Sequence, residues 1–118
     1  MWDILFAPEY VEEFRALDPA AQEAILVKID LLRDQGPNLG RPTVDTVRGS
    51  VFPNMKELRV QHSGQPWRIL FAFDPARRAI FLVGGNKAGD KRWYKRFIPI
   101  ADARYRRHLG SDSNGRSL

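Results

Sequence analysis

The chain has 118 residues, of which 43% are hydrophobic and 28% charged, and these values fit a single globular domain with a modest core. No apolar run approaches the roughly 20 residues that a membrane-spanning helix needs. Residues 1–6 lack the basic start of a secretory signal peptide. Cysteine is absent, which excludes disulfides and thiolate metal sites. We therefore expect a cytoplasmic protein without a membrane segment.

The net charge of +5 is distributed unevenly along the chain. Residues 1–55 carry five basic and nine acidic side chains, a net charge of −4, whereas residues 56–118 carry fourteen basic and five acidic ones, a net charge of +9. The two values add up to +5. A localised basic half is typical of proteins that bind polyanions, nucleic acids above all, although a solubilising surface has the same composition.

The first 35 residues predict a short strand followed by a helix hairpin. The strand covers Asp3–Phe6, and Pro8 lies in the first turn of the helix that follows. Asp18 and Pro19 are the N-cap and the first residue of a second helix that runs to about Gln35. The hairpin should pack against one face of a sheet. The apolar stripe expected on its second helix contains Ala21, Ile25, Leu26, Ile29, Leu31 and Leu32.

The middle of the chain predicts a three-stranded meander. Glycine and proline recur through residues 38–54, which therefore read as a long irregular connection. Alternating or continuous apolar residues then indicate strands separated by turns at 62–65 and 74–78. The strands expected are 55–61, 67–73 and 79–83.

The geometry of this meander brings cations together. The loop at the first turn can have two residues (63–64) or four (62–65). Both lengths give the same register, in which Arg59 lies opposite Arg68. Like charges directly opposite on a sheet are destabilising, so such a pair usually has an anion between its members. The third strand should place Val83 or Gly84 opposite Arg68, and the chain then leaves through two glycines to Lys87. Because glycines allow close approach to the backbone, this end of the sheet is a candidate phosphate site.

The C-terminal part predicts helix. We expect a helical piece near 90–97, a basic helix over 99–109 and a disordered, Ser- and Gly-rich tail over 110–118. The folded domain is then 1–109. Together the elements predict an α+β fold, in which an N-terminal helix hairpin packs on a small antiparallel-rich sheet of about four strands.

The order of these elements and several sequence blocks resemble a known family. In succession over residues 3–109, they resemble the RelE/ParE superfamily of bacterial toxins, and within it the HigB branch with its phage-derived Gp49-like proteins. The resemblance implies a RelE-like fold. The blocks are Lys56-Glu57-Leu58-Arg59, Trp67 to Pro75, Gly84 to Gly89, Trp93-Tyr94, and Ile98-Pro99 with Ala101.

This resemblance implies the toxin of a type II toxin–antitoxin system, an endoribonuclease that cleaves mRNA in the ribosomal A site and so inhibits translation. The implied chemistry needs no metal or cofactor, because the ribose 2′-hydroxyl attacks the adjacent phosphate. The implied partners are a helix-turn-helix, HigA-like antitoxin, the ribosome and mRNA. Two alternatives stay open: a ParE-like toxin that inhibits DNA gyrase, and a catalytically silent nucleic-acid-binding module. The converging cations favour the first function, since a gyrase inhibitor needs no phosphate site.

In-line attack requires a base, cations for the phosphoryl oxygens and an acid for the leaving oxygen. Arg68 and Arg59 are expected to hold the phosphate, and both match basic positions of the superfamily. Lys87 is expected to be a further phosphate ligand or a proton shuttle. Tyr94 should stack on a base or orient the scissile nucleotide. The other residues expected to contact RNA are Lys56, Lys91, Arg92, Trp93, Lys95 and Arg96.

The general base stays open at this stage. Glu57 and Asp90 are the only carboxylates expected near the site, and Glu57 stands two residues before Arg59, where the RelE pattern has a lysine. His62 belongs to the hairpin turn and His108 to the end of a helix, so both are expected outside catalysis. No histidine or carboxylate cluster has the spacing of metal ligands, which predicts no metal.

Overall fold

The computed structural model describes the backbone of residues 1–115 and the side chains of residues 1–111. No helix in this part of the chain is long and apolar enough to cross a membrane. The helices are α1 (Pro8–Arg15), α2 (Pro19–Gln35) and α3 (Trp93–Gly115), with a 3-10 turn η1 (Gly36–Asn38). The strands are β1 (Asp3–Phe6), β2 (Val44–Thr46), β3 (Lys56–His62), β4 (Gln65–Phe73) and β5 (Arg78–Asn86).

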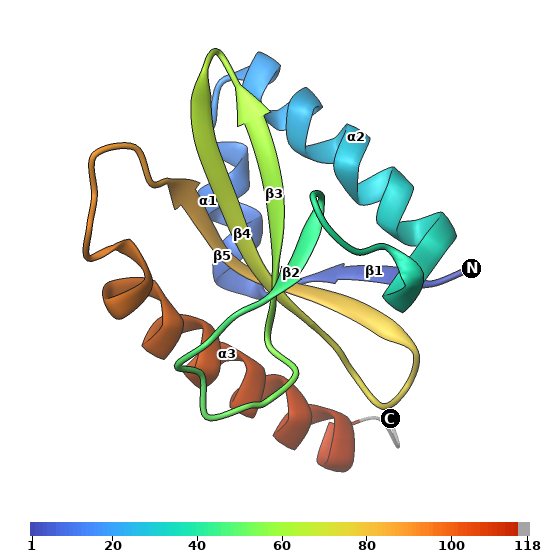
Figure 1. Cartoon of the computed structure of the whole chain (residues 1–118). Coiled ribbons are helices and arrows are strands. Elements are labelled where there is room, and N and C mark those ends of the chain that lie inside the picture. The colour runs from blue at the N-terminus through green and yellow to red at the C-terminus, as the bar shows by residue number, and fades with distance from the viewer. Residues whose placement is uncertain (116–118) are drawn as a thin grey trace.

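The strands form one sheet in the order β1-β5-β4-β3-β2. Strand β1 pairs with β5 in parallel, and every other neighbouring pair is antiparallel. Helices α1 and α2 lie on one side of the sheet and α3 lies on the other (Figure 1). The predicted α+β class, the antiparallel-rich sheet and the N-terminal helix hairpin are therefore confirmed.

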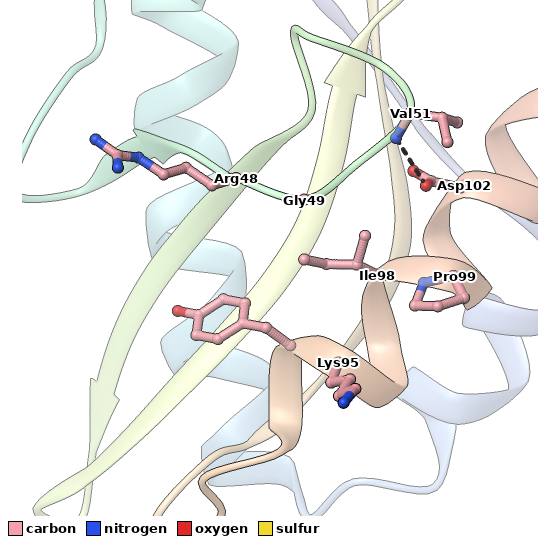
Figure 2. Close-up of a pocket in the computed structure, with 8 residues that line it drawn as sticks. Arg48, Gly49, Val51, Lys95, Ile98, Pro99 and Asp102 are labelled. Atoms are coloured by element: carbon pink, nitrogen blue, oxygen red, sulfur yellow. Dashed lines mark hydrogen bonds between the residues drawn. The ribbon is translucent and has the colours of Figure 1, made fainter.

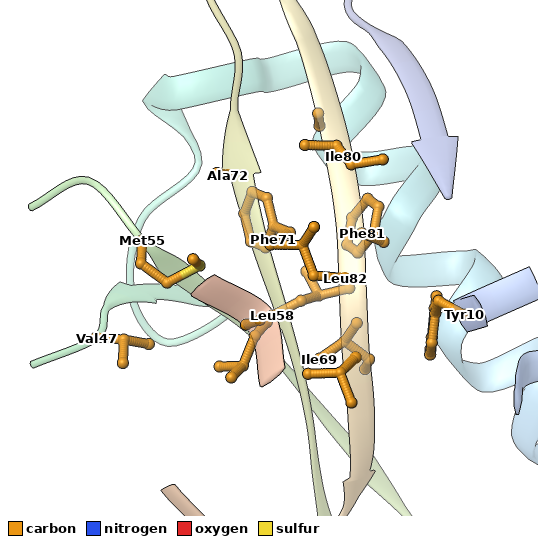
Figure 3. Close-up of a cluster of buried hydrophobic side chains, with 14 of the residues drawn as sticks. Tyr10, Val47, Met55, Leu58, Ile69, Phe71, Ala72, Ile80, Phe81 and Leu82 are labelled. Carbon is orange, nitrogen blue, oxygen red and sulfur yellow. The ribbon is translucent and has the colours of Figure 1, made fainter. Parts of the chain in front are cut away.

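The largest part of the core lies between the sheet and the helix hairpin (Figure 3). Phe71 and Phe81 are fully buried cross-strand partners on β4 and β5, and their rings stack with centroids 4.9 Å apart. Phe6 of β1 contacts Phe81, and it also contacts Tyr10 of α1 with ring centroids 5.0 Å apart. Burial of these aromatic rings fixes the sheet against α1, since each ring removes a large apolar area from water.

Helix α2 begins as its sequence predicts. The Asp18 side chain accepts a hydrogen bond from the Ala21 amide at 2.9 Å, and Pro19 occupies the first turn. Ala21, Ile25, Ile29 and Leu32 are buried against the sheet. The predicted stripe was too wide, because Leu26 and Leu31 are 44% and 37% exposed. These two side chains lie on the flanks of the helix, where a single sheet face does not reach.

Strand β2 corrects the prediction of an irregular connection over residues 38–54. Val44, Asp45 and Thr46 pair with Leu58, Glu57 and Lys56 of β3, so the sheet has five strands instead of about four. Three residues between proline and glycine are too short for a periodicity signal. The strand exists because β3 offers it an open edge.

The register of the first hairpin is confirmed, and that of the second is corrected. Arg59 lies opposite Arg68, and the connecting loop is Ser63-Gly64 with positive φ at both residues, as in a type I′ turn. Arg68 lies opposite Gly85, one residue beyond the predicted partners. The cause is a β-bulge, since Leu82 is an extra residue between the pairs Phe71–Phe81 and Leu70–Val83.

Helix α3 is continuous, whereas the sequence predicted two helical segments meeting at Pro99. Pro99 lies inside the helix, exposed to solvent, while its neighbours Ile98 and Ala101 are buried against the sheet. This packing outweighs the hydrogen bond that proline cannot make. The helix also runs past the predicted end at Leu109 to Gly115, so the segment 110–115, predicted to be disordered, continues it; residues 116–118 lie outside the described residues.

Candidate active site around Glu57

The anion between the two facing arginines is a side chain of the protein itself. Glu57 precedes Arg59 by two residues on β3, so both side chains project from the same face of the sheet. The Arg59 Nε donates to Glu57 Oε2 at 3.0 Å, and the Arg68 Nε lies 3.8 Å from Glu57 Oε1. The carboxylate thus offsets the repulsion that the cross-strand arginine pair would otherwise suffer.

Tyr94 of α3 completes this cluster from the opposite side. Its hydroxyl donates to Glu57 Oε1 at 2.6 Å, and Glu57 is only 3% exposed. Burial, together with this hydrogen bond to a carboxylate, raises the pKa of Tyr94 to about 12. At neutral pH the phenol is therefore protonated, and it can donate a hydrogen bond or a proton.

Arg68 has an unused donor. Its Nη1 donates to the Trp67 carbonyl at 3.0 Å, but its Nε is buried and has no hydrogen-bond partner among the described residues. Glu57 Oε1 lies 3.8 Å from this Nε, too far for a hydrogen bond. Arg68 is therefore less fully engaged by carboxylates than Arg59.

Arg59 is more fully engaged than Arg68. Besides its bond to Glu57, its Nη2 donates to Asp45 Oδ2 at 3.0 Å. The hydrogen bond with Glu57 raises the pKa of Arg59, so the guanidinium is charged at any physiological pH. Sequence analysis missed Asp45 because β2 was not recognised. The pattern Val44-Asp45-Thr46-Val47 does not alternate and is too short to indicate a strand, so the sequence offered no signal for Asp45.

Arg48 is the other residue that sequence analysis missed. It lies in the loop after β2 and is exposed. Together with Asp45, Glu57, Arg59 and Tyr94 it lines a hollow on this face of the molecule. Its lining combines the carboxylates of Asp45 and Glu57 with the guanidinium groups of Arg48 and Arg59.

Lys87 contacts the Tyr94 side of this cluster. Its ammonium lies over the Tyr94 ring, 5.8 Å from the centroid. The two glycines before it serve the packing, contrary to the prediction that they admit a ligand. A Cβ at Gly84 would lie 2.9 Å from Ile69 Cγ1, and one at Gly85 would lie 3.3 Å from Trp93 Nε1.

Trp93 and Tyr94 have separate roles. Trp93 is 1% exposed and stacks on Phe97 with centroids 4.8 Å apart, so the prediction that it contacts RNA is wrong. Tyr94 is half-buried and reaches the cluster. Adjacent helical residues point in directions about 100° apart, which places one ring in the core and the other at the site.

The exposed cations around the start of α3 divide into two groups. Lys91 and Arg92 precede the helix and Lys95 lies in its first turn, all three exposed. Arg96 is exposed too, but it forms an ion pair with Asp90. Asp90 also accepts a hydrogen bond from the Arg92 amide at 3.0 Å, so it caps this turn and lies outside the Glu57 cluster.

Three further polar residues lie away from the cluster. Strand alternation turns Lys56 to the face opposite Glu57, and its ammonium donates to Thr46 Oγ1 at 2.8 Å. His62 lies beside the hairpin turn. His108 contacts the buried Asp74 through Nε2 at 2.8 Å, where Asp74 also binds the Arg78 amide. Both histidines thus have structural positions.

Comparison with known proteins places the chain in a family. Residues 12–106 match the family described as "Phage derived protein Gp49-like". A protein of Mycobacterium tuberculosis named "Putative toxin HigB3" is 51% identical over 113 residues, which cover 95% of this chain and 97% of the relative. The chain belongs to the Gp49-like family. It is a HigB-like toxin of the RelE/ParE superfamily, as its sequence blocks predicted.

A second relative and a solved structure extend this picture. The M. tuberculosis protein named "Putative toxin HigB2" is 52% identical over 95 residues, which cover 79% of this Gp49-like chain and 47% of the relative. The structure of a mutant of the E. coli toxin RelE in the free state has a TM-score of 0.59 to this toxin at 15% identity. The match covers 82% of this chain and 98% of the RelE chain, and it confirms the RelE-like fold.

The described part of this HigB-like toxin, residues 1–115, contains no group of three histidine, aspartate or glutamate side chains that could hold a metal ion. The carboxylates at the site, Glu57 and Asp45, instead bind the guanidinium of Arg59. The chemistry that this donor set supports is stabilisation of negative charge by cations and by a phenol.

Proposed function

We propose that this toxin is an endoribonuclease that cleaves mRNA on the ribosome by attack of a ribose 2′-hydroxyl on the adjacent phosphate. The observation that carries the proposal is the convergence of Arg59, Arg68 and Tyr94 on the buried carboxylate of Glu57, with Lys87 beside the Tyr94 ring. Such a cluster combines two groups needed for phosphoryl transfer: fixed cations for the phosphoryl oxygens and a protonated donor for the leaving oxygen.

Each group has a defined role in this proposal. Arg68 binds a non-bridging phosphate oxygen through its guanidinium group, assisted by the ammonium of Lys87 beside Tyr94. The proton of the attacking 2′-hydroxyl passes to water. Tyr94, whose pKa is about 12, turns its O–H from Glu57 to the 5′ oxygen that leaves, gives it the proton and regains one from solvent. Glu57 holds the phenol at 2.6 Å and the Arg59 guanidinium at 3.0 Å, so the three side chains keep one geometry before the substrate arrives.

The partners follow from the same proposal. The substrate is mRNA displayed in the ribosomal A site, and the toxin is neutralised by a cognate antitoxin of the helix-turn-helix, HigA-like type. The relatives named as HigB toxins support an antitoxin partner. The exposed cations Lys91, Arg92 and Lys95 beside the cluster suit contacts with RNA phosphates.

A purified translation system with mapping of mRNA 5′ ends tests the proposal. Wild-type toxin should produce cuts that require ribosomes, and Arg68→Ala should reduce the cleavage rate by about a hundredfold or more, as removal of one charge-stabilising donor does. Arg15→Ala is the matched control, because Arg15 is exposed on α1 and pairs only within that helix in the described structure. Intact mRNA with inhibited gyrase supercoiling would indicate the ParE-like function instead.

A further inference from the structure

A second hollow lies at the outer edge of β3, and Arg59 lines both this hollow and the one described above. Its volume is about 350 Å³, within the range of about 300–1,000 Å³ typical of ligand sites. Three cations from three elements meet there: Lys28 of α2, Arg59 of β3 and Arg68 of β4. Thr43 and Gln61 add uncharged polar side chains to the lining. The chemistry proposed above does not use Lys28 or these two residues.

The β3-edge hollow differs in charge from its neighbours. The hollow that shares Arg59 with it also contains the carboxylates of Asp45 and Glu57. The hollow between the loop after β2 and α3 has Asp102 in its wall, where this carboxylate accepts a hydrogen bond from the Val51 amide at 3.1 Å (Figure 2). Within the described residues, no carboxylate lines the β3-edge hollow. An anion that enters it therefore meets only cations and uncharged groups.

Lys28 is the unusual member of this hollow, because it comes from the acidic helix hairpin. The basic side chains of the hairpin are Arg15, Lys28 and Arg33. Arg15 pairs with Glu12 and Arg33 pairs with Asp30. Lys28 has neither a carboxylate partner nor a side-chain hydrogen bond among the residues that the structure describes. Its charge is therefore available to a ligand.

The helical repeat explains why Lys28 reaches the sheet edge. Lys28 follows Ile25 by three residues and precedes Leu32 by four, and both of these side chains are buried against the sheet. Lys28 itself is half-buried. A lysine at the border of an apolar face packs its methylene stem on that face and extends its ammonium to the edge. Here the edge is the part of β3 beyond Leu58, which β2 does not cover.

We propose that the β3-edge hollow binds the RNA phosphate that neighbours the scissile phosphate, with Lys28 as its cationic ligand from α2. Arg59 lines both hollows and faces Arg68 across the strands, so one RNA strand can pass along the arginine pair from one hollow to the other. This inference rests on the proposed nuclease function, because it takes the path of the RNA from the Glu57 cluster. A backbone contact reads no base, so Lys28 adds affinity without changing which bases flank the cut.

Binding is tested without cleavage, using the single-stranded DNA tetranucleotide of thymidine, which lacks the attacking 2′-hydroxyl. In a titration followed by amide NMR, the wild-type amides of Thr43 and Gln61 should shift and saturate. Lys28→Met removes the charge and should weaken binding about threefold to fivefold at low salt, as loss of one exposed ionic contact does. The plot of log affinity against log salt concentration should become shallower by about 0.7, the value for one phosphate of a single strand.

Two further variants separate the charge of Lys28 from its packing. Lys28→Arg keeps the charge and should restore both the affinity and the salt slope. Arg33→Met is the matched control, because it removes a cation from the same helix at a side chain that is also half-buried. It should keep the wild-type slope. An unchanged slope in Lys28→Met, or no saturable shift at Thr43 and Gln61, would overturn the site.

The nuclease function is assessed separately by end mapping on ribosomes over a range of toxin concentrations. Lys28→Met should cut at the same positions as wild type, more slowly at low toxin concentration but at an equal rate at saturation. Arg68→Ala should be slow at every concentration. A lower saturated rate in Lys28→Met contradicts a role confined to binding, and absence of cutting by the wild type contradicts the nuclease function.

Discussion

At the scale of single residues, the site is organised by one buried carboxylate. Glu57 holds two side chains from different elements, Arg59 from β3 and Tyr94 from α3, and it lies close to Arg68 from β4. The sequence predicted the arginine pair, because alternation and a short turn fix the register of a hairpin. It also placed Glu57 on the same face as Arg59 and expected the carboxylate to tune that arginine, but it did not predict the hydrogen bond from Tyr94 of α3.

Removal of the Tyr94 hydroxyl tests the role of the phenol. Tyr94→Phe keeps the ring but deletes the donor at 2.6 Å from Glu57, and ribosome-dependent cleavage should slow by about a hundredfold. Tyr105→Phe is the control, because it makes the same chemical change further along α3, outside the cluster. Rapid-quench rates that are equal for wild type and Tyr94→Phe would exclude the phenol from the chemical step.

Because of the same phenol, the stability of the folded protein should depend on pH in the alkaline range. Burial, with the Glu57 hydrogen bond, raises the pKa of Tyr94 from 10.0 to about 12, and burial also raises the pKa of Tyr10. The folded state therefore keeps protons that the unfolded chain releases above about pH 10, so stability falls as the pH rises from about 10 to 12. Urea midpoints at about pH 8 and pH 10.5 should show this fall. The fall should be smaller in Tyr94→Phe, and an equal fall in both proteins would argue against the raised pKa.

At the scale of elements, the bulge in β5 shapes the site. Leu82 shifts the pairing by one residue, so that Gly85 faces Arg68 and leaves room for Trp93. The Leu82 carbonyl accepts a hydrogen bond from Arg104 of α3 at 2.8 Å. The sequence predicted the strand but not the bulge, and the partner of the bulged residue's carbonyl lies 22 positions later in the chain.

Arg104 should contribute more to stability than its neighbour Arg107. Its side chain is 15% exposed and binds both the Leu82 carbonyl and Glu13, whereas Arg107 is 50% exposed and pairs with Glu9. Arg104→Met should lower the free energy of unfolding by about 1–3 kcal/mol, because it leaves a partly buried carbonyl unsatisfied. Arg107→Met should cost about 0–1 kcal/mol. Urea unfolding of both variants measures the difference, and equal losses would mean that Arg104 does not support the bulge.

At the scale of the whole molecule, the uneven charge of the chain separates into two regions. Arg104 and Arg107 of α3 pair with Glu13 and Glu9 of α1, so that part of the basic half is neutralised within the fold. The cations near the start of α3 and in the loop before it are exposed beside the Glu57 cluster. Composition alone predicted a basic half. Only the ion pairs between α1 and α3 show which of these cations are neutralised within the fold.

The sequence predicted features that depend on residues close together in the chain and missed features that depend on distant residues. The capping of α2 by Asp18 and the hairpin register depend on neighbours in sequence, and both were predicted. Strand β2, which brings Asp45 to the site, exists only because β3 has an open edge. The buried position of Trp93 depends on Gly85 across the sheet, so its prediction as an RNA contact was wrong.

The most direct measurement compares two messages on purified ribosomes, one entirely RNA and one with a single 2′-deoxynucleotide at the mapped cut. Attack by the 2′-hydroxyl predicts that the toxin cleaves the first message to a 2′,3′-cyclic phosphate and a 5′-hydroxyl and leaves the second intact at that position. Arg68→Ala should leave both messages intact. Cleavage of the deoxy-substituted message at the same bond, or an uncut all-RNA message with normal translation, would contradict the proposed function.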